Sequence, residues 1–413
     1  MGKEFPIRNG LTYITNYHVT APNGVENAMH IGILTGGGDV PGLNPCIKAL
    51  TREALRQGWR VTGFRRGWAG PLSYNPADTQ AQAQWLLPLD ANAVRTIDRS
   101  GGTILHTSRT NPGKVKPGDL PDFLKGAGLP VNKEGVTDAT AHVLKVLEHL
   151  KIDALVPIGG DDTLSYAARL AQEGVRVMSV PKTMDNDVFG TDYCIGFSTA
   201  VSRSVEFITA LRTPAGSHER LAVIELFGRN SGETALISGF LADADRVAIP
   251  ECPVDLDRLS QQLLADRAAN PSGYGVLIVS EGAAIEGGSA MERGEEDAYG
   301  HRKLGGIGEF IGEEVKRRTG VNIISQSLAY LMRAGGPDAL DRMVAASYGA
   351  MAVQLLADGE QGKMMAVRDG NYTTVPVDTC IQGQRRVDVG ALYDTQEYRP
   401  QIAQVRGKPM FLY

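Results

Sequence analysis

This chain of 413 residues has few cysteines, no long apolar run and no excess of positive charge. The four cysteines (Cys46, Cys194, Cys252 and Cys380) are widely spaced and form no Cys-x-x-Cys pair. That spacing excludes a zinc ribbon and a disulfide framework and favours reduced thiols. No apolar stretch approaches the roughly 20 residues that cross a bilayer. The sequence therefore predicts a protein without a membrane-spanning helix or structural disulfides.

The charge balance excludes another class of partner. The net charge is −5, from 42 basic and 47 acidic residues, and no long Lys/Arg run offsets the acidity. A nucleic-acid partner is therefore not expected. The first 28 residues are mixed and polar, without the apolar core of a signal peptide, so we expect a cytoplasmic protein.

Two nucleotide-binding fingerprints are also missing. No Gly-Lys pair is followed by Ser or Thr, as a Walker P-loop requires, and the glycines do not space as Gly-x-Gly-x-x-Gly. A Rossmann dehydrogenase is excluded on that ground.

Strand-like and helix-like segments alternate along most of the chain. We expect helices near 138–150, 164–173, 199–211, 256–269 and 337–357, and strands near 29–34, 154–158, 175–180, 221–226, 246–249, 275–280, 364–367 and 372–377. This rhythm predicts an α/β fold with mostly parallel sheets flanked by helices. Residues 284–304, rich in glycine and charge, are interpreted as an exposed mobile loop. A polar tail is expected after the last strand.

A glycine-rich turn follows the first predicted strand, over Thr35-Gly36-Gly37-Gly38-Asp39-Val40-Pro41-Gly42-Leu43-Asn44. Consecutive glycines let backbone N–H groups turn toward an anion, and the next helix adds its positive N-terminal end. The turn fits a phosphate site, although strand-to-helix turns also use glycine for their geometry alone.

Two further polar runs follow predicted strands: Gly159-Gly160-Asp161-Asp162-Thr163 and Pro181-Lys182-Thr183-Met184-Asp185-Asn186-Asp187. Ligands of open α/β sheets bind outside the carboxyl ends of parallel strands, where these runs should meet. Carboxylates, a lysine and hydroxyls suit a metal-bound phosphate and the removal of a proton from an alcohol. Asp161 and Asp162 also fit the first turn of a helix, which favours acidic residues. An EF-hand is excluded because Phe189 occupies its fifth ligand position.

Arginines recur at the ends of predicted elements, at Arg109, Arg212, Arg220, Arg229 and Arg333. Solvated surface arginines are common, but positions beside glycines and strand ends suit bidentate phosphate clamps. Glu281 follows the strand that ends at Ser280 and could accept hydrogen bonds from sugar hydroxyls.

In order and spacing, these motifs resemble the phosphofructokinase family from about residue 29 to 357. Besides the three runs above, the resemblance rests on Gly190-Thr191-Asp192-Tyr193, Phe227-Gly228-Arg229 and Ile249-Pro250-Glu251. It implies a fold of two α/β lobes with the active site between them. It also implies phosphoryl transfer to the 1-hydroxyl of fructose 6-phosphate, with Mg²⁺ as cofactor.

The resemblance implies a division of the chain. Residues 1–28 would be an N-terminal extension and 29–180 a donor-binding lobe, to which the C-terminal part returns. Residues 181–335 would bind the sugar phosphate, and 336–413 would hold a helix, short strands and a tail.

The resemblance also implies roles for single residues. Asp185 would be the general base, Asp161 would hold Mg²⁺, and Thr183, Asp187 and Lys182 would position the reacting groups. The donor-binding residues would be Gly37, Arg109, Asp162 and Lys182. The residues that would bind fructose 6-phosphate are Thr183, Met184, Asp185, Arg220, Phe227, Gly228, Arg229, Glu281, Tyr330 and Arg333, with Arg220 reaching a neighbouring subunit's site.

The donor is indicated by Asp162 and Lys182. ATP-dependent members of the family usually have glycine at the first position and often at the second. A carboxylate at 162 would crowd and repel an α-phosphate, while Lys182 offers a point charge to a short, highly charged donor. The pair resembles the pyrophosphate-dependent branch, in which the reaction is reversible.

Some positions depart from the family pattern. Tyr330 stands where ATP-dependent members often have histidine, Ile324 where an arginine from a neighbouring subunit often meets the sugar phosphate, and Arg99 is shifted by one residue. Three functions compete: a pyrophosphate-dependent phosphotransferase, an ATP-dependent sugar-phosphate kinase, and a catalytically silent sugar-phosphate-binding subunit. The first is favoured, and we expect it to form a homodimer or homotetramer.

Overall fold

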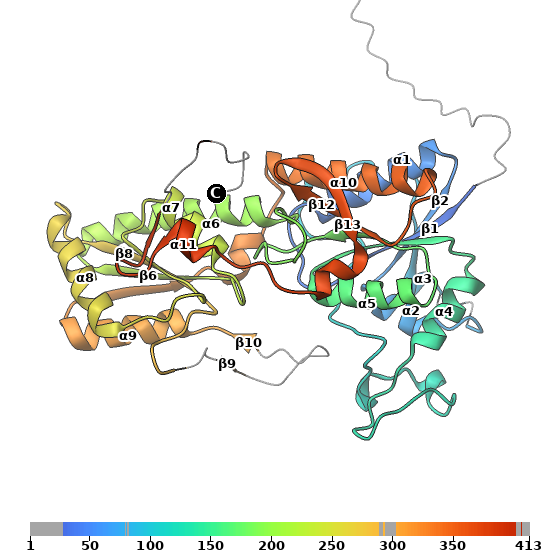
Figure 1. The fold of residues 1–413 in the computed structure, drawn as a ribbon, viewed down its shortest axis with the longest axis horizontal. Coiled ribbons are helices and arrows are strands. Elements are labelled where there is room, and N and C mark those ends of the chain that lie inside the picture. Colours follow the sequence, from blue (N-terminus) through green and yellow to red (C-terminus); the bar gives the residue numbers. More distant parts are fainter. Residues whose placement is uncertain are drawn as a thin grey trace, which may run out of the picture.

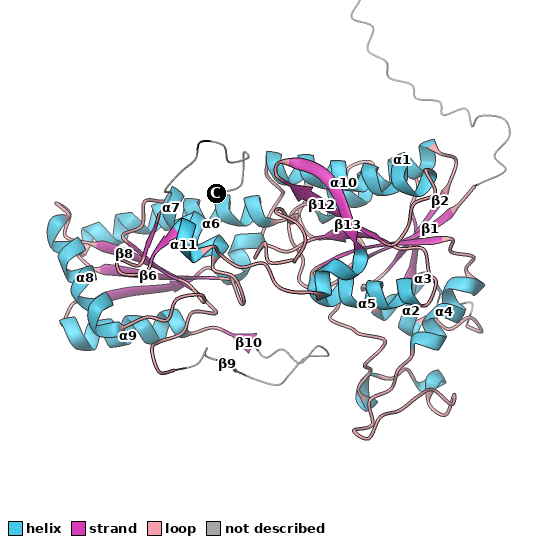
Figure 2. Ribbon diagram, in the orientation of Figure 1, coloured by secondary structure: helices cyan, strands magenta, loops and turns pink. Residues whose placement is uncertain are grey.

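The protein, described by a computed structural model, consists of two α/β lobes side by side, each built on its own sheet (Figure 1). The structure describes residues 28–78, 80, 82–288, 292–293, 303–401 and 406. Nearly all of the expected N-terminal extension and most of the expected 284–304 loop lie outside these residues. The α/β class expected from the sequence is confirmed (Figure 2).

The first lobe holds a mixed seven-stranded sheet with the order β13-β12-β5-β4-β1-β2-β3. Four central strands and β12 are parallel, and the edge strands β3 and β13 are antiparallel to their neighbours. The strands are β1 (His30–Thr35), β2 (Arg60–Phe64), β3 (Leu86–Pro88), β4 (Ala154–Gly159), β5 (Met178–Pro181), β12 (Lys363–Arg368) and β13 (Asn371–Pro376). Both β1 and β4 are buried throughout, as expected of central parallel strands.

Helices cover both faces of this sheet and form two apolar clusters. On one face, α1 and α10 pack against each other, and on the other α4 and α5 pack with Trp68 and Tyr74 (Figure 2). The helices are α1 (Leu43–Arg56), α2 (Ala69–Ser73), α3 (Gln82–Trp85), α4 (Thr140–His149), α5 (Asp161–Gln172) and α10 (Ala339–Ala357), with 3-10 turns η1 (Ile97–Arg99), η2 (Pro117–Asp119), η3 (Asp122–Leu124) and η5 (Val377–Ile381). Helix α5 begins three residues earlier than expected, so Asp161 and Asp162 form its first turn.

The second lobe holds a four-stranded parallel sheet with the order β11-β6-β8-β7. Its elements are α6 (Phe197–Ser217), β6 (Leu221–Leu226), α7 (Glu233–Leu241), β7 (Arg246–Ala248), α8 (Leu256–Ala269), β8 (Gly275–Ser280), α9 (Ile307–Thr319), β11 (Ile323–Ser327) and η4 (Ala329–Arg333). A small antiparallel pair, β9 (Glu292–Arg293) and β10 (Lys303–Leu304), lies within the expected loop. Helix α6 extends beyond its expected end and contains Pro214.

The end of the chain differs from the expected polar tail. After η5 it crosses from the first lobe to the second (Figure 1), where α11 (Val389–Leu392), β14 (Tyr393–Asp394) and β15 (Arg399–Pro400) lie against β7 and α7. The Tyr398 side chain is fully buried, and its carbonyl accepts a hydrogen bond from Val247. Tyr393 and Tyr398 hold this segment, because both rings bury a large apolar surface. The Tyr393 hydroxyl donates to the Val247 carbonyl, and the Tyr398 hydroxyl accepts from the Asp255 amide. The sequence analysis did not indicate that this segment packs against the second lobe.

Among the residues that the structure describes, no helix is both long and apolar enough to cross a membrane.

Candidate active site

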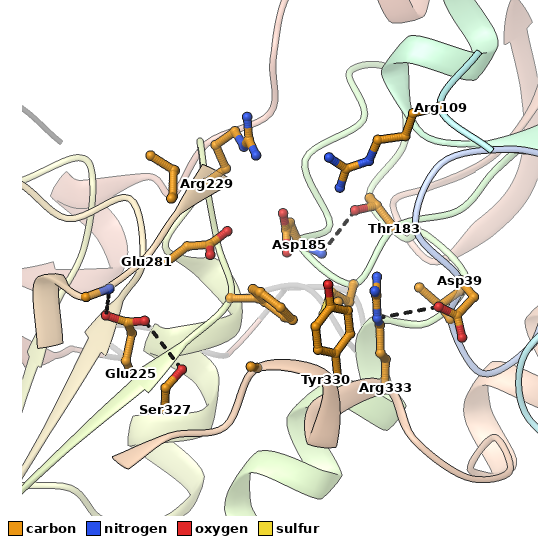
Figure 3. Close-up of a pocket in the computed structure, with 18 of the residues that line it drawn as sticks. Asp39, Arg109, Thr183, Asp185, Glu225, Arg229, Glu281, Ser327, Tyr330 and Arg333 are labelled. Carbon is orange, nitrogen blue, oxygen red and sulfur yellow. Dashed lines mark hydrogen bonds and ion pairs between the residues drawn. The ribbon is translucent and has the colours of Figure 1, made fainter. Parts of the chain in front are cut away.

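A cavity of about 890 Å³ opens between the lobes and is lined from both sides (Figure 3). The first lobe contributes the glycine-rich turn after β1, the loop that carries Arg109 and the loop after β5. The second lobe contributes the ends of β6, β8 and β11 and the turn η4. The structure thus brings together these residues singled out from the sequence: Arg109, Lys182, Thr183, Met184, Asp185, Phe227, Arg229, Glu281, Tyr330 and Arg333.

The glycine-rich turn after β1 packs directly against the run Gly159-Gly160-Asp161-Asp162-Thr163. A Cβ atom at Gly36 would lie 2.3 Å from the Thr163 hydroxyl oxygen, so only glycine permits this approach. The next residue, Gly37, has φ of +76°, and a Cβ there would lie 3.3 Å from the Lys182 Nζ atom. The turn therefore places backbone amides beside a buried lysine without an intervening side chain.

Lys182 is 3 % exposed, and its Nζ donates a hydrogen bond of 2.6 Å to the carbonyl of Gly38. Burial and, to a smaller extent, the charge of the neighbouring Arg333 lower the pKa of Lys182 to about 8. A buried ammonium group with one backbone partner retains donors for an anion. The geometry agrees with a phosphate contact.

The loop after β5 places the Asp185 carboxylate centrally in the cavity, between Thr183 on one side and Glu281 on the other (Figure 3). The Asp185 amide donates to the Thr183 hydroxyl at 3.2 Å. Burial raises the pKa of Asp185, and the charges of Asp187 and Glu281 raise it further. A carboxylate with a raised pKa is a stronger base toward an alcohol proton.

Further carboxylates lie on the donor side. Burial and the charges of Asp187, Asp162 and Asp185 raise the pKa of Asp161, and burial raises that of Asp187. The Oδ1 atoms of Asp161 and Asp185 are buried without a hydrogen-bond partner. Because mutual repulsion and unpartnered oxygens are relieved by a cation, these residues fit Mg²⁺.

The described residues form no preformed metal cage. In the described part of the chain, no three His, Cys, Asp or Glu side chains converge on one point as metal ligands. Magnesium sites of phosphoryl-transfer enzymes commonly use one or two carboxylates and take further oxygens from the substrate phosphates. The donor set is consistent with that kind of site.

A second cavity, of about 550 Å³, lies on the far side of the Asp-Asp motif. It is lined by Asp161, Asp162 and Ser165 of α5 and by residues 380–384 and Arg386 of the C-terminal segment. Sequence analysis did not predict that the C-terminal segment lines this cavity, because residues 380–386 follow Asp162 by more than 200 positions in the chain.

The second-lobe wall is richer in arginine and aromatic groups. The Arg333 guanidinium lies 4.6 Å from the Tyr330 ring centre and 5.8 Å from that of Phe227, and its Nε is 3.6 Å from Asp39 (Figure 3). The pKa of Glu281 is raised to about 7, because the effect of burial outweighs the opposing effect of the Arg229 charge. Gly228 has φ of +142° and no room for a Cβ beside Ser280. These residues could surround a sugar phosphate and accept from its hydroxyls.

Some residues singled out from the sequence do not line the interlobe cavity. Asp187, two residues after Asp185, is 8 % exposed, and Asp161 and Asp162 line the second cavity. Arg220 precedes β6, whereas the cavity lies at the opposite end of that strand. Within one chain Arg220 does not reach the cavity, so its place in a neighbouring subunit's site stays a prediction.

Sequence analysis missed Asp39 as the partner of Arg333, and it missed Glu225. The Glu225 carboxylate accepts from the amides of Gly306 and Gly308 at 2.9 and 2.8 Å and from Ser327 at 3.4 Å (Figure 3). It therefore caps α9 and shapes the cavity wall. The sequence does contain one indication of this role: Glu225 is the single carboxylate in the otherwise apolar strand Leu221–Leu226.

Comparisons with known proteins agree with the geometry. A family model described as phosphofructokinase matches residues 30–356. The chain is 39% identical over 363 residues to the pyrophosphate–fructose 6-phosphate 1-phosphotransferase of Amycolatopsis mediterranei, covering 87% of this chain and 97% of that protein. It is 38% identical over 352 residues to the ATP-dependent 6-phosphofructokinase of Chloroflexus aggregans, covering 84% and 89%.

Solved structures agree on the fold. The pyrophosphate-dependent phosphofructokinase of Nitrosospira multiformis superposes with a TM-score of 0.70 at 17% identity, over 93% of this chain and 95% of that one. From the family model and the extent of these alignments, the chain belongs to the phosphofructokinase family.

Proposed function

We propose that this protein transfers a phosphoryl group reversibly between pyrophosphate and the 1-hydroxyl of fructose 6-phosphate, giving fructose 1,6-bisphosphate and orthophosphate. The observation that carries the choice of donor is the presence of Asp162, in the first turn of α5, and of buried Lys182, directly after the neighbouring strand β5, although the two side chains line different cavities. The relative from Amycolatopsis mediterranei has the corresponding name.

In the forward direction the 1-hydroxyl oxygen attacks one phosphorus atom of pyrophosphate. The bond from that phosphorus to the bridging oxygen breaks, and orthophosphate leaves. The hydroxyl proton passes to Asp185, whose carboxylate lies in the cavity with a raised pKa. Thr183 and Asp187 position the reacting groups.

The sugar phosphate would lie against the second-lobe wall. Arg229 and Arg333 would pair with its phosphate, and Glu281 would accept from its hydroxyls. The donor would lie against Gly37, Arg109 and Lys182. Asp161 would hold Mg²⁺, which supplies positive charge to the donor oxygens.

Donor selection follows from charge and space. The Asp162 carboxylate would repel the extra phosphate of a nucleotide, whereas Lys182 would neutralise one of the closely spaced charges of pyrophosphate. Overall identity does not separate the donors, because the relatives named for pyrophosphate and for ATP are 39% and 38% identical. The argument therefore depends on these two residues.

The test is a steady-state assay of the purified protein with fructose 6-phosphate, Mg²⁺ and either pyrophosphate or ATP. We expect turnover with pyrophosphate, turnover in the reverse direction with orthophosphate, and loss of both in excess chelator. ATP-dependent turnover alone would establish the competing kinase function, and inactivity with both donors would support a silent binding subunit.

We further propose that the enzyme works in the cytoplasm as a homodimer or homotetramer. The proposal is supported by Arg220, which lies too far from its own cavity to serve it, and by the resemblance that places this arginine in a neighbouring site. Sedimentation analysis of the wild type tests the assembly.

A further inference from the structure

The loop that carries Asp185 is held from behind by the C-terminal strap, which we define as residues 382–387. The strap leaves η5 on the first lobe and crosses to the second lobe ahead of α11 (Figure 1). On the way Gln384 forms an antiparallel bridge with Val188, and the Arg385 amide donates to the Asp187 carbonyl at 3.0 Å. The strap is therefore an added strand-like partner of the loop.

The Arg385 side chain makes two contacts on the same side. Its Nη1 donates to the Asn186 carbonyl at 3.0 Å and forms an ion pair with Glu233, the first residue of α7. The Asn186 side-chain amide also donates to Glu233, at 3.1 Å. Arg385, Glu233 and Asn186 thus form a closed triangle, with side chains of Arg385 and Glu233 that are 23% and 12% exposed.

Asn186 has an unusual backbone. Its φ is +55°, a left-handed conformation that is uncommon for residues with a side chain, although asparagine adopts it more readily than most. Its side chain accepts from the Cys194 amide at 2.8 Å and donates to the Asp192 carbonyl at 3.0 Å. Asp185 and Asp187 flank this residue, so its conformation decides where both carboxylates point.

The other side of the loop is also held from α7. The Thr234 hydroxyl donates to the Met184 carbonyl at 2.8 Å. The carbonyl before Asp185, that of Met184, is therefore bound by α7, and the carbonyl after it, that of Asn186, is bound by the strap. Arg385 is not among the residues that line either cavity, so it does not reach the substrates from where it lies.

We propose that Arg385 is a positioning residue for the phosphoryl transfer: paired with Glu233, it holds Asn186 and so aims Asp185 and Asp187. The proposal rests on the proposed role of Asp185 as base. A misplacement of about 1 Å can cost about 10²-fold in rate while substrate contacts survive. The expected signature is a loss of kcat with little change in KM.

The experiment compares Arg385→Ala with the wild type and with Arg399→Ala as matched control. Arg399 also belongs to the C-terminal segment and pairs with a carboxylate, Asp266, at 2.8 Å, but it lies against the far side of the second lobe. We expect Arg385→Ala to lower kcat about 10²-fold with both KM values within about threefold, and Arg399→Ala to change neither. Added guanidinium should restore part of the lost kcat, which a merely unstable variant would not show.

A folded Arg385→Ala variant with wild-type kcat, or one whose loss lies in KM alone, would overturn the proposal. If the alanine variant does not fold, the near-isosteric Glu233→Gln decides, since it removes the charge pair but keeps the shape. Lower kcat at unchanged KM then supports positioning, and unchanged kcat contradicts it. A wild type that uses only ATP contradicts the proposed donor, and the same comparison is then made with ATP. A wild type inactive with both donors removes the role of Asp185 and this proposal with it.

Discussion

The two walls of the interlobe cavity are built in different ways. The donor wall comes from the runs that follow strands β1 and β5 and from the loop that carries Arg109, and within it Lys182 is deeply buried whereas Arg109 is exposed. The sugar wall comes from β6, β8, β11 and η4, and its most prominent aromatic side chain, Tyr330, is 63% exposed whereas Lys182 is 3% exposed. Lys182 is therefore held in place before substrates arrive, whereas Tyr330 has freedom to adjust.

This difference teaches where specificity should reside. Buried, preorganised charges discriminate strongly, because a wrong ligand leaves them unpaired or repels them. An exposed side chain such as that of Tyr330 contributes less, since water competes for its contacts. Substitution of Lys182 should therefore have a larger effect than substitution of Tyr330.

The largest effect is expected for Asp185→Asn, which keeps the shape but cannot accept the proton. General-base catalysis contributes about 10²–10⁴ in rate, so kcat should fall by that factor while KM for fructose 6-phosphate stays within severalfold. Asp192→Asn is the control, because the Asp192 carboxylate accepts from Asp369 outside the cavity. Near-normal turnover in Asp185→Asn would remove this residue from the mechanism.

The next effect is expected for Lys182→Gly. One charge-assisted contact, about 1.5–3 kcal/mol, is lost from the donor, so KM for pyrophosphate should rise about 10- to 100-fold. KM for fructose 6-phosphate should change little if the two walls act separately. Equal changes in both constants, measured in the same assay, would contradict the division into walls.

The pH dependence sharpens the same comparison. Because burial lowers the pKa of Lys182 to about 8, raising the pH through that value removes its positive charge, and kcat/KM for pyrophosphate should fall. At the acid end, protonation of Asp185, whose pKa is raised, should lower kcat/KM as the pH falls. A pH profile of Lys182→Gly should lack the alkaline limb. Retention of that limb would assign it to another group.

The smallest effect is expected for Tyr330→Phe on the sugar wall. The change removes one exposed hydroxyl, worth about 0.5–1.5 kcal/mol, and should raise KM for fructose 6-phosphate about 2- to 10-fold. KM for pyrophosphate should not move. A larger effect than that of Lys182→Gly would reverse the ranking of the two walls.

The meeting of the three polar runs at one edge of the sheet could be predicted from sequence because each run is local. Glycines, the Asp-Asp pair and the Asp-Asn-Asp run each follow a buried strand, and parallel strands bring their ends together whatever the rest of the chain does. The sheet order, with β12 and β13 beyond β5, was not predictable, since it depends on contacts between distant segments.

The long-range supports of the site could not be predicted for the same reason. Arg385 reaches Asn186 across almost 200 positions of the chain, and the motifs around each residue give no sign of the other. Tyr398 lies in a stretch of mixed polarity, so only the packing against the second lobe shows that the segment is held. Glu225 was visible as a charge within an apolar strand, but its role as the cap of α9 requires the fold.

The measurement that tests the account most directly is the ratio of kcat/KM for pyrophosphate to that for ATP, in the wild type and in Asp162→Gly. If the Asp162 carboxylate occupies the space of an α-phosphate, the wild type should prefer pyrophosphate, and the glycine variant should gain measurable use of ATP. A wild type that prefers ATP, or a folded Asp162→Gly variant that still rejects it, would contradict the account.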